Sequence, residues 1–158
     1  MLRNPVHLLA FGFGSGLAPK APGTFGTLVA IPLVFLLQYY ATLPTYLMVT
    51  VSASLGGLWI CGYTAQALGV HDHPAIVWDE IAGYMIAMIA LPFTWFNVIA
   101  AFALFRFFDI YKPGPIGWCD KNLSGGAGIM VDDLLAGVAS ALVLHSLHGL
   151  HASFNLFA

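Results

Sequence analysis

Carboxylates gather at three points of a chain that holds only seven acidic residues. Asp79 and Glu80 are adjacent, Asp132 and Asp133 are adjacent, and Asp109 lies between the two pairs. Carboxylates that converge repel one another unless a cation lies among them, and oxygen ligands without Cys or His spacing favour Mg²⁺. Because Mg²⁺ usually keeps some of its waters and is completed by a substrate phosphate, these residues indicate a phosphorylated ligand.

Helix capping is the alternative explanation of the same acids. We expect Asp79–Glu80 and Asp132–Asp133 to open helices and Asp109 to close one, and an acid at a helix start satisfies free backbone N–H groups. Capping explains neither the second acid of each pair nor Asp109, whose charge opposes the dipole at a helix end. Adjacent helical residues point about 100° apart, so one acid can cap while the other faces a ligand.

Basic and small residues flank the acids and fit a phosphate. Side chains of this type clamp phosphate; the basic candidates are Lys20, Arg106, Lys112 and Lys121. Thr24 lies in a Gly-rich helix entrance whose free N–H groups could hold an anion. Gly125 and Gly126 would allow close backbone approach, although a plain flexible turn explains them equally well. His71 is a candidate acid or base, or simply a solvated loop residue.

The composition is that of an integral membrane protein. Apolar residues make up 59% of the chain and charged residues 8%, whereas a typical soluble domain carries about 25% charged residues. The net charge of -2 does not suggest nucleic-acid binding, which requires a basic face. We expect one membrane-embedded domain over residues 1–158, with no nucleic-acid partner.

Five apolar segments are expected to form the helices. They are Thr24–Ala41, Tyr46–Leu68, Ile81–Leu91, Trp95–Phe108 and Leu134–Leu150. The third and fourth, on either side of Pro92, are short for the ~30 Å hydrocarbon core and form either two tight spans or a re-entrant hairpin. The sequence therefore predicts an all-α, polytopic membrane protein with about four to five apolar helices.

Following these segments back and forth places every charged residue on one side of the membrane. All five Lys and Arg residues lie on the side of the N-terminus, and the opposite side has no charge. The positive-inside rule makes the charged side cytoplasmic. The carboxylates should therefore face the cytoplasm.

Three motifs resemble the bacterial phosphatidylglycerophosphatase A family. They are "GFGSGLAPKAPGTFGTL", "HDHPAIVWDEIAGY" and "FRFFDIYKPGPIGWCDKNLSGGAGIMVDDLLAGV", and the resemblance extends from about Asn4 to Val138. It implies an Mg²⁺-dependent lipid phosphatase of the inner membrane that converts phosphatidylglycerophosphate to phosphatidylglycerol and phosphate. Its substrate would be a phospholipid within the bilayer.

The resulting hypothesis gives the residues three roles. Asp79, Glu80 and Asp133 would bind the metal. Arg106 and Lys112 would neutralise the developing charge. Asp109 or Asp132 would deprotonate the attacking water or form an aspartyl-phosphate. Whether one metal or two bind, and the oligomeric state, stay open at this point.

Two other classes of protein are also weighed. A membrane phosphotransferase of phospholipid synthesis would use a carboxylate-bound metal too, but would release a nucleotide monophosphate instead of free phosphate. A cation carrier would need acids near the bilayer midplane. The expected position of the acids at one interface argues against a carrier.

Overall fold

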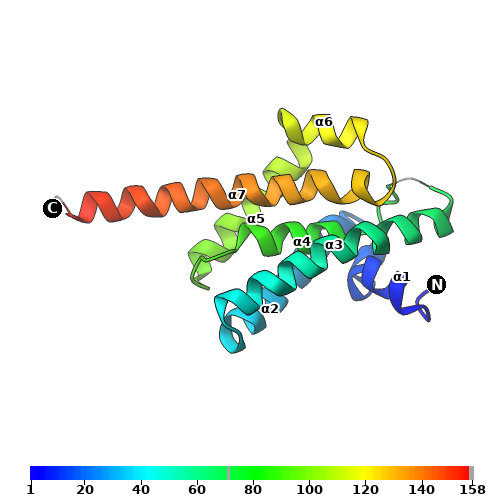
Figure 1. Ribbon diagram of the computed structural model, residues 1–158, viewed down its shortest axis with the longest axis horizontal. Coiled ribbons are helices and arrows are strands. Elements are labelled where there is room, and N and C mark those ends of the chain that lie inside the picture. The colour runs from blue at the N-terminus through cyan, green and yellow to red at the C-terminus, as the bar shows by residue number, and fades with distance from the viewer. Residues whose placement is uncertain (71, 157–158) are drawn as a thin grey trace.

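The computed structural model describes residues 1–70 and 72–156, and side chains as far as Leu150. These residues form helices and no strands, which confirms the predicted all-α class. The elements, labelled in Figure 1, are α1 (Pro5–Ala10), the 3₁₀ helix η1 (Gly12–Leu17), α2 (Pro22–Tyr40), α3 (Leu43–Leu68), α4 (Trp78–Ala87), α5 (Trp95–Tyr111), α6 (Pro115–Asn122) and α7 (Gly125–Leu156).

Three helices are long and apolar enough to cross a membrane: α2, α3 and the Gly125–Leu150 part of α7. The prediction of a helical membrane protein is therefore confirmed. The helix α4 has only 10 residues, which is about 15 Å at 1.5 Å per residue and too short for a ~30 Å core. It turns back into α5 near Pro92, and this turn lies beside the α2–α3 connection.

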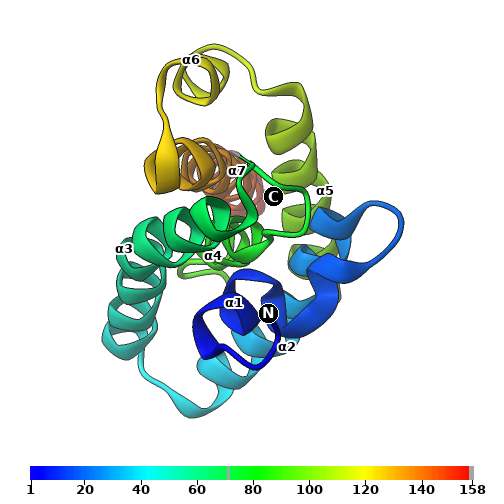
Figure 2. The ribbon, with the colours of Figure 1, turned by 90° about the vertical axis from the view of Figure 1, so that its right-hand side faces the viewer.

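The short helix α4 forms the centre of the fold. It contacts α2, α3, α5 and α7, and Figure 2 shows it among them. Ile81, Ala82 and Tyr84 are fully buried on it. The Tyr84 hydroxyl donates to the Val98 carbonyl of α5, and the Trp78 indole donates to the Ala53 carbonyl of α3. A helix enclosed on all sides can bury apolar residues all round.

Glycines allow α4 and α7 to cross closely. A Cβ added to Gly83 of α4 would meet the backbone of Asp133, and one added to Gly137 of α7 would meet the backbone of Gly83. Small residues let helices in lipid approach to backbone contact. The α4–α7 crossing is therefore fixed by two glycines, each one turn beyond an aspartate: Asp79 and Asp133.

Two predicted helix starts are wrong. The second apolar helix begins at Leu43 instead of Tyr46, because Pro44 lies in the first turn, where its missing N–H is not needed. The last helix begins at Gly125 instead of Leu134. Gly125 has a φ of +64°, outside the right-handed region, and the small apolar residues that follow continue directly into the helix. Asp132 and Asp133 therefore lie inside α7 and do not cap its start.

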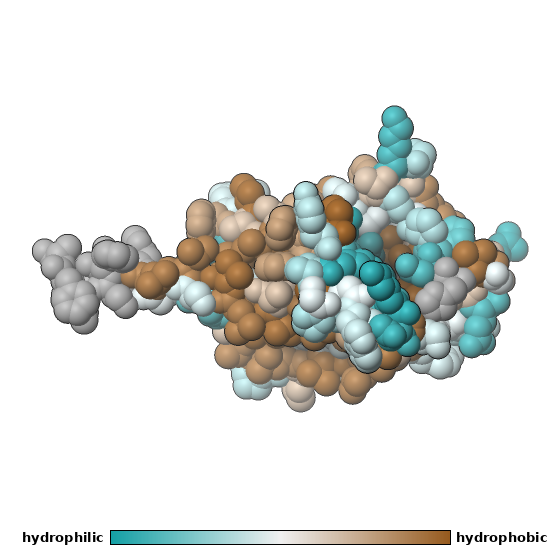
Figure 3. Space-filling view, turned by 90° about the horizontal axis from the view of Figure 1, so that it is seen from above, coloured by the Kyte–Doolittle hydropathy of each residue, from teal (hydrophilic) through white to brown (hydrophobic). Residues whose placement is uncertain are grey.

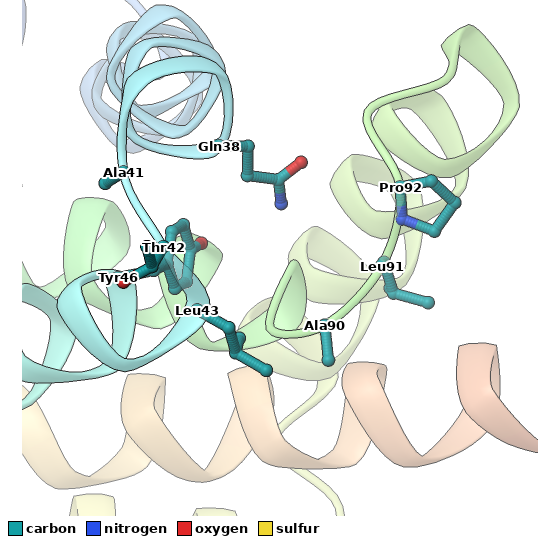
Figure 4. A pocket seen from close by; sticks show the side chains of 8 residues that line it. All are labelled: Gln38, Ala41, Thr42, Leu43, Tyr46, Ala90, Leu91 and Pro92. Carbon is teal, nitrogen blue, oxygen red and sulfur yellow. The ribbon is translucent and has the colours of Figure 1, made fainter.

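The end of the bundle remote from the charges is closed by hydrogen bonds to the α4–α5 turn. Gln38 donates to the Met88 carbonyl, and the His145 ring bonds the Ile89 carbonyl at 2.9 Å. A pocket of about 450 Å³ lies here, between the α2–α3 connection and the turn, and its lining is uncharged (Figure 4). The described charged residues all lie toward the opposite end, as expected from the sequence.

Candidate active site

A polar cavity of about 300 Å³ opens where α2, α4, α5 and α7 meet at the charged end. The predicted chemistry-bearing residues that line it are Asp79, Glu80, Arg106, Asp109, Lys112, Asp132 and Asp133. Ala21, Pro22 and Gly23 form one wall, and a Cβ on Gly23 would collide with the Glu80 carboxylate. The bundle thus brings together the five acids and two of the four bases that the sequence singles out.

Three carboxylates form the core of this cavity. One oxygen each from Asp79, Glu80 and Asp133 lie within 4.8 Å of one another. Asp79 and Asp133 are 7% and 3% exposed, so little water reaches them. The glycine crossing of α4 and α7 lies one turn below both aspartates and holds them face to face.

These carboxylates lack the partners that buried charges need. Asp79 Oδ1 and Glu80 Oε2 are buried, and the described residues offer them no hydrogen-bond donor. The pKa of Asp79 is raised well above its usual value. Burial is the largest cause, and repulsion from the Glu80 and Asp133 charges comes second. Burial also raises the pKa of Glu80 to about 7. Buried charges are paired or bind metals, so the oxygen donors fit a hard divalent cation.

Two further acids of the cavity, Asp109 and Asp132, are each paired with a base. Arg106 forms an ion pair with Asp109, and its Nη1 lies 3.8 Å from Glu80 Oε1. Lys112 Nζ donates to Asp132 Oδ2 at 2.5 Å and to Asp120 Oδ1 at 2.5 Å. Burial lowers the pKa of Lys112, but its two carboxylate partners outweigh that effect and raise it. Lys112 therefore stays charged beside its two carboxylates.

The backbone of Lys112 is held in an unusual conformation. It has a φ of +45°, which L residues rarely adopt, and its N–H caps the Phe108 carbonyl at the end of α5. Strain of this kind costs about 1–3 kcal/mol and persists where the surroundings fix it. Here α6 and α7 fix it through the two ion pairs, which aim the ammonium into the cavity.

Several predicted substrate-binding residues lie outside the cavity lining. They are Lys20, Thr24, Lys121, Gly125 and Gly126. Gly126 lies against α3, where an added Cβ would collide with the Leu58 carbonyl, so helix packing explains it. The assignment of these residues to substrate binding stays a prediction. His71, also predicted to contact substrate, lies outside the described residues.

Two features of the site were missed at the sequence level. Asp120 was not singled out as a site residue, although it holds Lys112 from α6. Gly83 and Gly137 were also missed, although each follows an aspartate by four residues. The repeated spacing, an aspartate followed by a glycine one turn later, was the available signal, because it places both on one helix face.

The cavity lies at the depth of a membrane interface. Two helices give the distance from the cavity to the far side of the bundle. At 1.5 Å per residue, α2 rises about 26 Å from Gly23 to Tyr40, and α7 rises the same distance from Asp133 to Leu150. That distance is close to the ~30 Å hydrocarbon thickness. Figure 3 shows the corresponding change from hydrophobic surface over most of the body to hydrophilic residues toward one end.

The fold and the site define a class: a helical membrane protein with a carboxylate-lined cavity at one membrane surface. The sequence profile described as Phosphatidylglycerophosphatase A matches residues 8–148. The chain belongs to this family. The family resemblance and the prediction of a phosphoric monoester hydrolase are therefore confirmed, and a lipid substrate follows from the relatives and the apolar helices.

Individual relatives agree with the family match. The Phosphatidylglycerophosphatase A of Escherichia coli (strain K12) is 49% identical over 91% of this chain and 84% of its own length. That of Haemophilus influenzae is 46% identical over 92% and 90%. A Bacteroides thetaiotaomicron relative, 42% identical over 87% and 89%, carries the provisional name phosphatidylinositol-3-phosphatase. No solved structure matches the chain.

Proposed function

We propose that this protein removes the terminal phosphate of phosphatidylglycerophosphate in an Mg²⁺-dependent reaction at the cytoplasmic face of the bacterial inner membrane. The observation that carries the proposal is the group of three carboxylates, buried Asp79 and Asp133 with partly buried Glu80, in which two oxygens lack a partner among the described residues. Its depth matches the position of a lipid headgroup. The names of the Escherichia coli and Haemophilus influenzae relatives indicate the substrate.

The carboxylate group would hold the metal, and the neighbouring bases would hold the phosphate. Bound Mg²⁺ would polarise the phosphoryl oxygens and offset their charge. Lys112 and Arg106 lie on the cavity wall with their charges fixed by ion pairs, so they can bind phosphoryl oxygens without reorganising as charge develops. Asp120 is a positioning residue because it acts through Lys112.

Asp132 is suited to move the proton. Its Oδ2 accepts from Lys112, while its Oδ1 is buried without a hydrogen-bond partner among the described residues. In this scheme Oδ1 takes a proton from water as the water oxygen bonds to phosphorus. The bond from phosphorus to the glycerol oxygen breaks, and that oxygen leaves as the alcohol with the proton that Asp132 took from water, which returns Asp132 to its carboxylate form. Asp109, held by Arg106, is the other candidate for this role.

Phosphate release by the detergent-purified protein tests the proposal. Phosphatidylglycerophosphate is supplied with Mg²⁺ or with a chelator, and Asp133→Asn is compared with Arg3→Gln, which removes an exposed charge outside the cavity. We expect release that requires Mg²⁺, is lost in Asp133→Asn and is retained in Arg3→Gln. Absence of release from folded wild-type protein would refute the substrate. Nucleotide monophosphate formed from a nucleotide-activated lipid would instead assign the transferase.

A further inference from the structure

An apolar groove of about 410 Å³ lies beside the carboxylate cavity, between α5, the start of α6 and α7. Phe108, Pro113, Ile116, Leu135, Val138 and Leu142 line it. Ile116 is buried, whereas Val138 and Leu142 are 43% and 64% exposed. The groove is therefore closed at α6 and open along the lipid-facing side of α7.

The groove continues directly from the cavity on each of three segments. Phe108 of the groove is adjacent in sequence to Asp109 of the cavity, and Pro113 is adjacent to Lys112. On α7, Leu135 follows Asp132 by three residues, which places it about one turn farther along the same side of the helix. Residues of the polar cavity and of the apolar groove therefore adjoin one another on all three segments.

The direction of the groove is that of a lipid molecule. From Asp132, the helix α7 runs toward the uncharged end of the bundle, so Leu135, Val138 and Leu142 lie progressively deeper in the bilayer. Leu135 to Leu142 covers about 10 Å at 1.5 Å per residue. A phosphate in the cavity would leave the apolar part of its own molecule on the side where the groove begins.

We infer that this groove is an acyl-chain subsite that holds one fatty acyl chain of the phospholipid whose phosphate occupies the cavity. The inference rests on the proposed function, since it assumes a lipid phosphate substrate. Its other basis is that groove and cavity residues adjoin at three places. The pairs are Phe108 with Asp109, Pro113 with Lys112, and Leu135 with Asp132. Among the described pockets, the one at the far end of the bundle lies across the membrane from the carboxylates.

The groove would orient the lipid substrate and would add little to the affinity for it. Lipid tails are as apolar as the groove lining, so moving a chain from bilayer to groove gains little free energy. A chain in the groove nevertheless fixes the direction from which the headgroup enters, and small errors in position cost rate. Filling the groove should therefore slow reaction of the lipid and leave a substrate without chains unaffected.

Phenylalanine substitutions at the groove test the first consequence. Val138→Phe and Ala139→Phe fill it, and Ala103→Phe is the matched control on an exposed face of α5 outside the groove. We expect kcat/KM for long-chain phosphatidylglycerophosphate to fall about tenfold in both groove variants. Hydrolysis of the deacylated headgroup should not change, and Ala103→Phe should change neither. Because Val138 is already exposed, Val138→Phe decides the question if Ala139→Phe does not fold.

Equal losses with both substrates, or no loss in Val138→Phe, would overturn the subsite. Photo-crosslinking separates that result from failure of the proposed function. The probe is phosphatidylglycerophosphate with a diazirine in one acyl chain, and its control is phosphatidylglycerol with the same chain, both illuminated briefly in detergent. We expect the phosphorylated probe to label residues 135–142 several-fold more than the control. Labelling there without hydrolysis would refute only the reaction, whereas hydrolysis with uniform labelling would refute only the groove.

Discussion

Arg106 shows how single residues balance charge in the cavity. Its guanidinium lies between Asp109 and Glu80, and all three side chains are less than one-fifth exposed, at 17%, 14% and 13%. Removing one member of a buried ion pair leaves the other charge without compensation, at a cost of about 3–5 kcal/mol. Arg106 therefore has a structural role that precedes any contact with phosphate.

We predict that Arg106→Met abolishes phosphate release and lowers the thermal stability of the detergent-purified protein. Arg106→Lys should lose part of the activity, because an ammonium keeps the charge but not the planar fork. The double variant Arg106→Met/Asp109→Asn should recover much of the lost stability but not the activity, since it removes the uncompensated charge. Thermal unfolding and phosphate release measure the two effects. Wild-type stability in Arg106→Met would contradict this account.

At the residue scale the sequence predicted the members of the site better than their partners. Asp79 and Asp133 were assigned together because acids are scarce in this chain and metals need them. The Lys112–Asp120 and Lys112–Asp132 pairs were not predicted, because they join three separate elements. Pairing of this kind depends on helix rotation and on where α6 folds back, and neither follows from residue spacing.

At the element scale the α4–α7 crossing positions the metal-binding candidates. The sequence predicted α4 to begin near its acids, and Asp79 and Glu80 do lie in its first turn. It missed the start of α7, because the glycines at residues 125, 126 and 128 have low helix propensity. Tertiary packing outweighs that propensity where Gly126 lies against the backbone of α3. Because the start of α7 was predicted too late, Asp132 and Asp133 were wrongly expected to open the helix.

We predict that Gly137→Ala weakens the metal site. Alanine favours a helix by about 1 kcal/mol over glycine, but the added Cβ would collide with the Gly83 carbonyl, and overpacking typically costs about 1–3 kcal/mol. The clash should prevail and push α4 from α7, separating Asp79 from Asp133. The measurement is the Mg²⁺ concentration that gives half-maximal phosphate release, which should rise.

Gly149→Ala is the matched control for Gly137→Ala. It lies on the same helix, and a Cβ added there meets none of the described atoms of other elements within 4 Å. It should leave the Mg²⁺ requirement unchanged and keep or slightly raise thermal stability. If the two variants respond alike to Mg²⁺, the crossing does not control the distance between the aspartates.

At the scale of the whole molecule, charge and depth together orient the protein. The charged end carries the cavity, α6 and the N-terminal helices, while the α2–α3 connection and the α4–α5 turn form the uncharged end. Under the positive-inside rule, the proposed orientation has the cavity facing the cytoplasm. Two native cysteines can report this orientation, because Cys119 is partly exposed on α6 whereas Cys61 is fully buried in α3.

We predict that a membrane-impermeant maleimide labels Cys119 in inverted inner-membrane vesicles but not in intact spheroplasts. Cys61 should stay unlabelled in both, because reagents reach only exposed thiols. The matched control is Cys119→Ser/Thr42→Cys, which moves the accessible thiol to the exposed α2–α3 connection. It should be labelled in spheroplasts. The reverse pattern in both proteins would place the carboxylate cavity on the outer face of the membrane and contradict the proposed cytoplasmic site.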